Sequence, residues 1–476
     1  MKPKIFSLIL LVLIISFSAT AQTVQKLAGT WEGVLNVGQE LRIVFHIKLD
    51  NKGVLMASAD SPDQSAYGLK CDTTFIKEDS LIIQMKNLRA TYSGTLKNDS
   101  TLQGIFNQGI PLPLNLKKVE KASVKIKPQE PKPPFPYKNL DVVYENADKS
   151  LKYGATITIP NGNGPFPAAV LITGSGPQNR DEEIMGHKPF AVIADYLTRQ
   201  GYIILRVDDR GVGKSSGDFS KATTADFAKD VNASVDYLLS RPEVDKNKLG
   251  LIGHSEGGMI APMVVAERKD IDFVVLLAGP GVKIVDLMSE QNSAILRSMK
   301  VPENAIDVYR PFYKKLITKL GAINDTTEAL NIARREMNEW AGKTDIKLLD
   351  QLDMDKEQSR EEIAYANVQA LSSPWFKYFL QFDPAPYLKK MKCKVLALNG
   401  DKDIQVIAQQ NLPGIEKALK KARNKNFEIK QLPGLNHLFQ TCKECTIVEY
   451  GMLDETFSPE VLKLISDWLI KNVKSK

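Results

Sequence analysis

Four mostly apolar runs after residue 139 constrain the fold of this chain more than any other feature. They cover residues 168–173, 202–207, 249–253 and 273–278. Strands that are buried on both faces show such runs, without alternation of polar and apolar residues. Because stretches with helical spacing separate the runs, the pattern predicts an α/β domain with a mostly parallel sheet.

The rest of the chain divides around a proline- and lysine-rich segment, residues 120–138, which we expect to be an extended, semi-rigid linker. Before it, residues 22–119 contain short strand-like runs separated by turn sequences, which predict a small all-β barrel or sandwich. Strand signals vanish over residues 284–385. We therefore expect a helical cap there, inserted between two parts of the α/β core, residues 139–283 and 386–476.

Residues 1–21 have the pattern of a secretory signal peptide. Lys2 and Lys4 precede a short apolar run, and small residues follow, so that cleavage is expected after Ala21. The run is too short to span a bilayer comfortably, and no cysteine follows that could carry a lipid. We therefore expect an exported protein, periplasmic or extracellular, without a stable membrane anchor.

The net charge of +7 is concentrated around the linker. Residues 117–138 hold seven lysines against two glutamates. A nucleic-acid-binding protein would carry its basic residues on a folded face, so we expect no nucleic-acid partner.

Four cysteines are present, and two of them, Cys442 and Cys445, form a C-x-x-C pair. One such pair cannot supply the four ligands of a structural zinc site, and the strand–helix setting of a thioredoxin-like redox motif is missing. We expect a local disulfide or two free thiols there, and neither a metal ion nor a cofactor.

Residues 253–257 read Gly-His-Ser-Glu-Gly, directly after an apolar run and before a helical pattern. In this setting a sharp turn lifts the serine side chain clear of the sheet. Gly253 and Gly257 allow the strand and the helix to approach closely. The helix begins beneath the serine, and the amide of Glu256 can donate to a developing oxyanion. The pattern predicts that Ser255 is a nucleophile.

A serine nucleophile needs a general base, and His437 is the best candidate because it follows an apolar strand, where such sheets build their sites. His46 belongs to the β domain. His254 adjoins Ser255, but neighbouring side chains point apart. His187 follows an acidic loop and is a weaker competitor.

An acidic residue must orient the base, and Asp401 and Asp403 both follow the apolar run of residues 395–399. Either fits the chain order serine, aspartate, histidine, and we expect the other to cap the turn. A second oxyanion donor is expected from the glycine-rich turn that begins at Gly174.

Residues 139–476 resemble bacterial α/β-hydrolase-fold esterases and the related serine aminopeptidase-type hydrolases. The resemblance rests on residues 174–181 (GSGPQNRD), residues 209–215 (DRGVGKS), the turn at Ser255, Gly400-x-x-Asp403 and Asn436-His437.

The resemblance implies Asp403 rather than Asp401 as the acid, and backbone oxyanion donors at Ser175 and Glu256. It also implies that the helical insertion caps the pocket, and that Asp209 and Arg210 brace loops behind the site. Thr173 stands where many relatives carry histidine, which leaves the backbone donor intact.

We further expect Gly176, Gln178 and His254 to line the substrate pocket. In the β domain, Gly29-Thr30-Trp31 resembles the Gly-x-Trp opening of lipocalin-like barrels. We expect Trp31 to fill one end of the β core; ligand binding by that domain is the alternative.

Three functions fit these expectations. The first is hydrolysis of small carboxylic esters with short acyl groups, through an acyl-enzyme formed on Ser255. The second is a peptidase or amidase that acts on short peptides with the same residues. The third is a binding protein with an inactive hydrolase fold. The sequence leaves the oligomeric state open.

Overall fold

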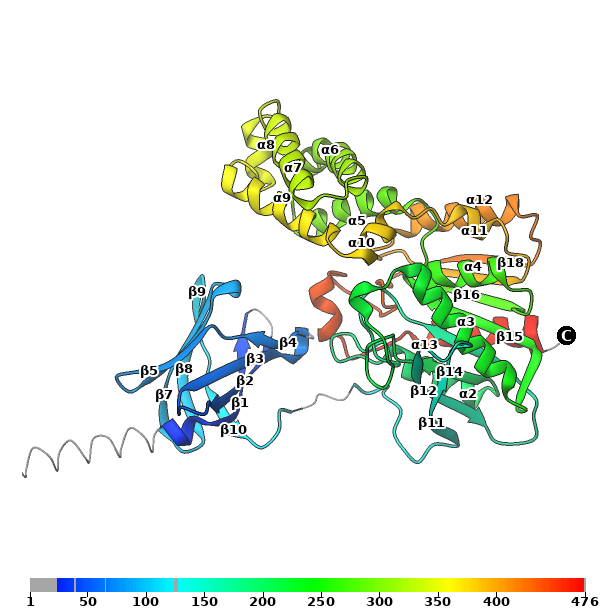
Figure 1. Ribbon diagram of the computed structural model, residues 1–476, viewed down its shortest axis with the longest axis horizontal. Helices are drawn as coiled ribbons and strands as arrows, with labels where there is room; N and C mark the ends of the chain where they lie inside the picture. Colours follow the sequence, from blue (N-terminus) through cyan, green and yellow to red (C-terminus); the bar gives the residue numbers. More distant parts are fainter. Residues whose placement is uncertain (1–23, 38–39, 65, 124–126, 475–476) are drawn as a thin grey trace, which may run out of the picture. The chain divides into compact units, whose positions relative to one another are not determined.

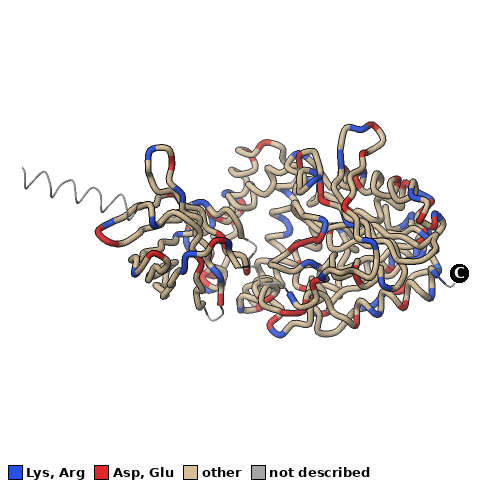
Figure 2. Tube along the Cα trace, turned by 90° about the horizontal axis from the view of Figure 1, so that it is seen from below, with Lys and Arg blue, Asp and Glu red and all other residues tan. Residues whose placement is uncertain are grey.

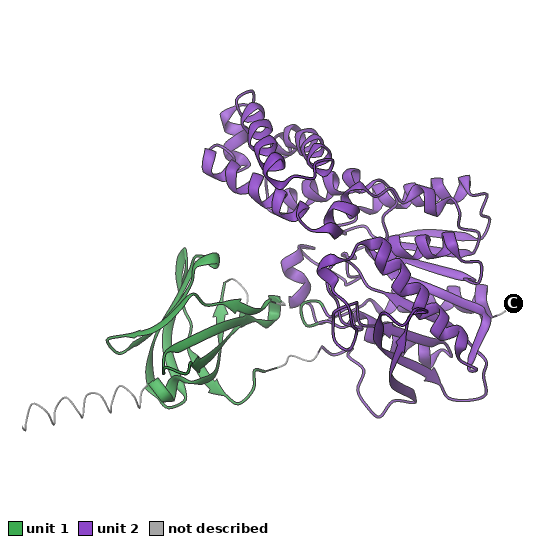
Figure 3. Cartoon of the chain, viewed as in Figure 1, with its two compact units in different colours: residues 1–126, 184–186 green, residues 127–183, 187–476 purple. Residues whose placement is uncertain are grey.

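The computed structural model describes residues 24–37, 40–64, 66–123 and 127–474 (Figure 1). Two compact units divide the chain: residues 1–126 with 184–186, and residues 127–183 with 187–476 (Figure 3). The expected signal peptide lies outside the described residues. Among the described helices, none is long and apolar enough to cross a membrane.

The first unit is one antiparallel sheet whose path is β4-β3-β2-β1-β10-β8-β7-β6-β5, with β9 paired to β8. The strands are β1 (Gly29–Asn36), β2 (Glu40–Leu49), β3 (Leu55–Ser61), β4 (Ala66–Lys70), β5 (Thr73–Lys77), β6 (Ser80–Met85), β7 (Ala90–Asn98), β8 (Thr101–Gln108), β9 (Ile110–Pro113) and β10 (Leu116–Val119). Because β3 also approaches β5, the sheet curls back on itself.

Trp31 lies fully buried in the core of this unit, and its indole donates to the carbonyl of Leu27 (2.7 Å). Phe45 and Tyr92 pack in the same core. Large side chains thus fill the interior of the sheet, which is the structural role that the sequence suggested for Trp31.

The second unit contains the predicted parallel sheet, in the order β11-β12-β14-β13-β15-β16-β17-β18. All pairs from β14 onward along this path are parallel, and β11–β12 and β12–β14 are antiparallel. The strands are β11 (Tyr137–Glu145), β12 (Lys152–Pro160), β13 (Phe166–Ile172), β14 (Ile203–Val207), β15 (Val244–His254), β16 (Phe273–Leu277), β17 (Lys394–Gly400) and β18 (Phe427–Leu432).

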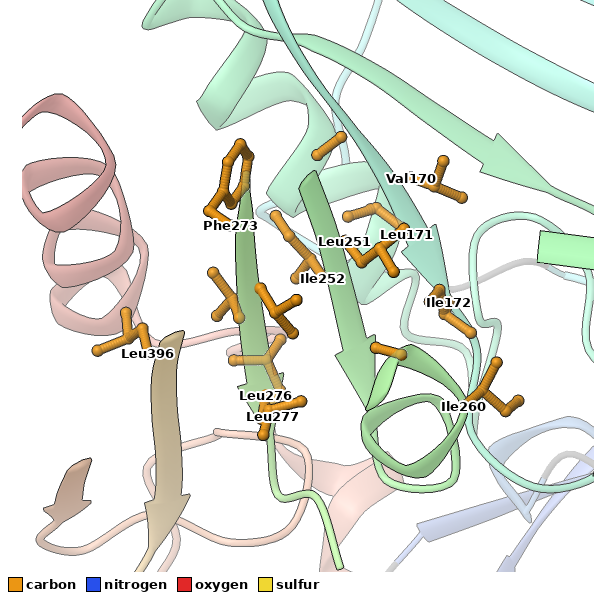
Figure 4. Close-up of a cluster of buried hydrophobic side chains, with 14 of the residues drawn as sticks. Val170, Leu171, Ile172, Leu251, Ile252, Ile260, Phe273, Leu276, Leu277 and Leu396 are labelled. Carbon is orange, nitrogen blue, oxygen red and sulfur yellow. The ribbon is translucent and has the colours of Figure 1, made fainter. Parts of the chain in front are cut away.

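Helices cover this sheet on both faces, and every residue of the central strand β16 is therefore buried. One group packs α2 against α13; a second joins α3, α4, α11 and α12. Side chains of β13, β15 and β16 interlock in the core between them (Figure 4). The core helices are α2 (Pro189–Arg199), α3 (Thr224–Ser240), α4 (Gly257–Glu267), α11 (Ala385–Leu388), α12 (Ala408–Lys421) and α13 (Pro459–Leu469).

A helical insertion lies between β16 and β17, where we expect the cap, and we refer to it by that name; it has its own apolar core around Phe312, Leu316 and Met337. The amide of Ile284 donates to the carbonyl of Phe382 (3.0 Å), so the two ends of the insertion meet. Its helices are α5 (Ile284–Ser298), α6 (Glu303–Gly321), α7 (Thr326–Ala341), α8 (Ile346–Gln351), α9 (Glu357–Leu371) and α10 (Pro374–Gln381).

The second half of the expected linker is part of the second unit rather than a free tether. Lys127 is buried, and its ammonium donates to the carbonyls of Gly451 (2.8 Å) and Leu453 (2.5 Å). Gln129 bonds to the backbone of Phe457, and β11 already begins at Tyr137. The composition of the segment did not reveal this, because the side chains of Lys127 and Gln129 donate to backbone carbonyls, which no residue type marks in the sequence. Elsewhere, basic and acidic residues are interspersed along both units (Figure 2).

The register of the parallel strands brings their carboxyl ends to one edge of the sheet. Ile172 of β13 pairs with Gly253 of β15, and His254 pairs with Leu277 of β16. Gly400 of β17 pairs with Leu432 of β18. The loops that carry the predicted site residues therefore leave the sheet side by side.

Candidate active site

Ser255 occupies a sharp turn between β15 and α4. Its φ is 52°, in the left-handed region that side chains other than glycine rarely adopt. A Cβ at Gly253 would lie 2.1 Å from the carbonyl oxygen of Gly257, and one at Gly257 would lie 2.1 Å from that of Ile172. Only glycine fits at either position, so these two residues permit the turn that presents the serine.

His437 and Asp403 meet at the same edge of the sheet. Nδ1 of His437 lies 2.7 Å from Oδ2 of Asp403, and both side chains are buried. The other carboxylate oxygen of Asp403 accepts from the amides of Gln405 (2.7 Å) and Val406 (2.9 Å). These contacts fix the orientation of the carboxylate, and the carboxylate in turn fixes the imidazole ring.

Asp401 has a different neighbour. Its Oδ1 accepts from the amide of Gly434 (2.7 Å), in the turn that leads into the loop of His437. Asp401 therefore caps a turn, and the structure places Asp403, not Asp401, beside the histidine.

The reactive atoms of Ser255 and His437 are available. Neither Oγ of Ser255 nor Nε2 of His437 hydrogen-bonds to another group in the described part of the chain. The serine hydroxyl and the base often form a well-aligned hydrogen bond only when substrate is bound. The histidine thus uses one nitrogen for Asp403 and keeps the other for chemistry.

The glycine-rich loop after β13 lies beside the nucleophile. A Cβ at Gly174 would lie 3.2 Å from Cβ of Ser255. The amides of Ser175 and Glu256 donate to no other group among the described residues, whereas the amide of Ser255 is used by the carbonyl of Leu277 (2.8 Å). Neither of the two amides that the resemblance implied is thus used by another described group, which is what an oxyanion donor requires.

Gly176 and Gln178 continue this loop. Gly176 has a φ of 94°, which glycine adopts without strain. The amide of Gln178 donates to Asp209 (2.8 Å), and its side chain donates to the carbonyl of Ser175 (3.2 Å). Gln178 thus braces the loop that carries the candidate oxyanion donor.

We expected His254 to line the substrate pocket, and that remains a prediction. The residue is buried, Nδ1 lies 2.9 Å from Glu182, and Nε2 lies 2.9 Å from the backbone carbonyl of His437. Both ring nitrogens at this end of β15 thus have partners within the protein. His187 is also buried and lies within hydrogen-bond distance of Thr456 (2.8 Å), which leaves it no role as the base.

The side chain of Glu256 links three elements next to the nucleophile. Its Oε1 accepts from Thr224 of α3 (2.6 Å) and from the indole of Trp375 in cap helix α10 (2.8 Å). Burial raises the pKa of Glu256, and these hydrogen bonds oppose the shift only in part. The cap is therefore tied directly to the residue that follows Ser255.

Asp209 and Arg210 support the loops behind the site, as the resemblance implied. Asp209 accepts from Thr173 (2.7 Å), and burial raises its pKa to about 8. Arg210 pairs with Asp230 (2.7 Å). All four residues border a cavity of about 40 Å³ between the sheet and α3, and neither Ser255 nor His437 lines it.

Cys442 and Cys445 form a disulfide, one of the two states that the sequence left open. Glu449 lies close enough to the pair for the three residues to resemble a metal site. Their sulfur atoms are bonded to each other, however, and only a thiolate would bind a metal ion.

Sequence reasoning missed two residues that contact this site, Glu182 and Trp375. Glu182 directly follows residues 174–181, the segment that carries part of the family resemblance, and this position could have marked it as a residue near the site. Trp375 lies 119 residues from Glu256 in a helical region, and nothing local marks it.

Comparison with known families supports the hydrolase reading of the second unit. Residues 187–341 match the family described as "Serine aminopeptidase, S33". Esterase EstD of Thermotoga maritima is 28% identical over 319 residues, which are 66% of this chain and 65% of the relative. An acyl transferase of Photorhabdus laumondii is 31% identical over 147 residues, 31% of this chain and 44% of the relative. The chain thus spans about two thirds or less of the length of these relatives.

Similar solved structures include the Pyrococcus furiosus esterase Pf2001, at 17% identity and a TM-score of 0.43, covering 71% of this chain and 92% of that one. The hypothetical protein PA2218 of Pseudomonas aeruginosa has 18% identity and a TM-score of 0.44, covering 74% of this chain and all of that one. The strand order, the turn at Ser255 and the sequence matches all indicate the same fold for the second unit. The second unit has the α/β-hydrolase fold, and its sequence is related to those of esterases and of the S33 serine aminopeptidases.

Proposed function

We propose that this protein hydrolyses carboxylic esters with Ser255 as nucleophile, His437 as general base and Asp403 as the orienting acid. The observation that carries the proposal is the buried hydrogen bond between His437 and Asp403 (2.7 Å), at the sheet edge where the turn presents Ser255.

In this mechanism Nε2 of His437 takes the proton of Ser255 as Oγ attacks the ester carbonyl. The amides of Ser175 and Glu256 stabilise the oxyanion. The imidazolium then protonates the departing alcohol, which leaves an acyl group on Ser255. Water, deprotonated by His437, attacks this acyl-enzyme and releases the acid.

The first test is labelling of the full chain with a fluorophosphonate probe, followed by turnover of aryl acetates. We expect Ser255→Ala to abolish labelling and to lower kcat at least about 10⁴-fold. Ser240→Ala, at the exposed end of α3, is the matched control and should retain both. A folded wild-type protein that neither labels nor turns over ester would favour the inactive binding protein.

The matched family description, a serine aminopeptidase, supports one alternative: cleavage of short peptides by the same residues. Comparing kcat/KM for an aryl acetate and an aminoacyl anilide separates the two. We expect the ester to react faster, with the highest kcat/KM at short acyl chains; faster turnover of the anilide would overturn the esterase assignment.

We also propose that the protein is exported to the periplasm or the extracellular space. The pattern of residues 1–21 supports this, and so does the Cys442–Cys445 disulfide, because disulfides persist in oxidising compartments. Cell fractionation and N-terminal sequencing test it: we expect a mature chain that begins at Gln22 outside the cytoplasm, and an intact Met1 on cytoplasmic protein would contradict it.

A further inference from the structure

A second histidine–carboxylate pair, Glu182 and His254, lies beside the catalytic histidine. The Glu182 and His254 side chains are 1% and 6% exposed. The rings of His254 and His437 have their centroids 4.8 Å apart. The mechanism described above uses neither side chain of this pair.

Both ring nitrogens of His254 face oxygen acceptors. Nδ1 lies 2.9 Å from Oε1 of Glu182, and Nε2 lies 2.9 Å from the carbonyl oxygen of His437. A carbonyl cannot donate, so Nε2 must carry a proton. Oε1 of Glu182 also accepts from the amide of Gly174 (2.7 Å). A neutral imidazole has only one N–H, so the ring can donate to both of these oxygens only as an imidazolium.

The surrounding charges agree with this state. Burial alone would lower the pKa of His254. The charge of Glu182 and the hydrogen bonds to Glu182 and to the carbonyl of His437 raise this pKa by more than burial lowers it. Asp403 adds a smaller contribution in the same direction. The other ring that faces His254, Phe439, is apolar. The charges that raise the pKa of His254 are thus the carboxylates of Glu182 and Asp403.

We propose that Glu182 and His254 form a permanently charged positioning pair that fixes the catalytic histidine loop to the oxyanion loop. One continuous chain of hydrogen bonds runs from the amide of Gly174 through Glu182 and His254 to the backbone of His437. Gly174 immediately precedes the candidate oxyanion donor Ser175. The pair thereby sets the distance between the group that moves the proton and the group that binds the oxyanion.

This role rests on the proposed function and predicts a particular kinetic signature. Small displacements of catalytic groups reduce the rate of the chemical step while substrate binding is little changed. Loss of the pair should therefore lower kcat much more than it alters KM. A side chain that merely fills space would lower stability and leave the kcat of the folded fraction intact.

The test variant is Glu182→Gln in the full chain, assayed with an aryl acetate. The glutamine has the same shape and can still accept from the amide of Gly174, but the charge that holds the second proton is gone. We expect kcat to fall about 10- to 100-fold and KM to change less than about threefold. Glu183→Gln, the adjacent exposed glutamate, is the matched control and should behave as wild type.

The second readout is the ¹⁵N NMR spectrum of histidine-labelled protein, which needs no activity. The chain has four histidines, and the signal lost in His254→Gln assigns His254. We expect imidazolium shifts for His254 at pH 8 in the wild type and in Ser255→Ala, and a neutral ring in Glu182→Gln.

These readouts separate the two proposals. A neutral His254 at pH 7 in the wild type, or a Glu182→Gln variant that keeps kcat within twofold, overturns the positioning pair. Failure of the wild type to label at Ser255 overturns the proposed function while the NMR result for His254 still stands. If Glu182→Gln does not fold, the wild-type spectrum alone decides.

Discussion

The Asp403–His437 and Glu182–His254 pairs have similar geometry, with contacts of 2.7 and 2.9 Å between buried side chains. They differ at the second ring nitrogen. Nε2 of His437 has no partner among the described residues, whereas Nε2 of His254 is occupied by a backbone carbonyl. In the roles that we propose, the partner of the second nitrogen decides what such a pair does: His437 exchanges a proton with Ser255, and His254 is held as a cation.

Two other carboxyl groups near the site, those of Glu256 and Asp209, have no histidine as a hydrogen-bond partner among the described residues. Both receive hydrogen bonds from neutral groups, and burial raises the pKa of each. Carboxyl groups around this site thus fall into two kinds: those compensated by an imidazole and those pushed toward the neutral form. Each main prediction below alters one of these carboxyl groups or a hydrogen-bond partner of one.

The largest effect is expected from Asp403→Asn. The asparagine can keep the contact with His437, but it favours the wrong tautomer and cannot stabilise the imidazolium. We expect kcat for an aryl acetate to fall about 10³- to 10⁴-fold. Steady-state kinetics of the folded variant measure this.

Asp401→Asn is the matched control, because Asp401 caps the turn at Gly434 and touches neither histidine. Its kcat should remain within about threefold of the wild type. A reversal, with Asp401→Asn inactive and Asp403→Asn active, would reject the assignment of the acid.

The sequence was sufficient for the chemistry that lies next to strand ends. Ser255 and Asp403 each follow a continuous apolar run, His437 follows the strand-like stretch of residues 427–431, and parallel strands place such positions at a common edge. The strand pattern therefore predicts both the α/β sheet and the proximity of these three residues.

The remaining contacts depend on where side chains point after folding. The contact of His254 with Glu182, 72 residues away, could not be predicted from the residues that adjoin either side chain. Lys127 looked like part of a solvated tether, yet it is buried against carbonyls more than 320 residues away.

An intermediate effect is expected from Trp375→Phe, which keeps an aromatic ring in α10 but removes the N–H that reaches Glu256 (2.8 Å). A buried acceptor that loses a donor costs about 1–3 kcal/mol, and here that cost weakens the docking of the cap. We expect KM for short-chain aryl esters to rise about 3- to 10-fold with kcat nearly unchanged.

Trp340→Phe provides the comparison for this cap variant, because Trp340 stacks on Phe312 inside the cap core (4.5 Å). It should lower thermal stability without raising KM. If both variants raise KM equally, general loosening of the cap, and not the bond to Glu256, is responsible.

The smallest effect on catalysis, and a distinctive effect on stability, is expected from Asp209→Asn. The folded-state pKa of Asp209 is about 8, whereas its ordinary value is 3.8. Between these values the folded protein binds more protons than the unfolded chain, so the contribution of Asp209 to stability falls as pH rises toward 8 and is constant above it. The asparagine lacks this titration and can still accept from the amide of Gln178.

Urea unfolding at pH 5, 6.5 and 8.5 measures the difference. The free energy of unfolding of Asp209→Asn, relative to wild type, should increase by at least about 1 kcal/mol from pH 5 to pH 8.5. Asp236→Asn, an exposed aspartate on α3, should show no such trend. A constant difference across the three pH values would mean that Asp209 is charged in the folded protein throughout. A carboxyl group without a histidine partner would then carry the same charge as Asp403 and Glu182, and the comparison between the two kinds would fail.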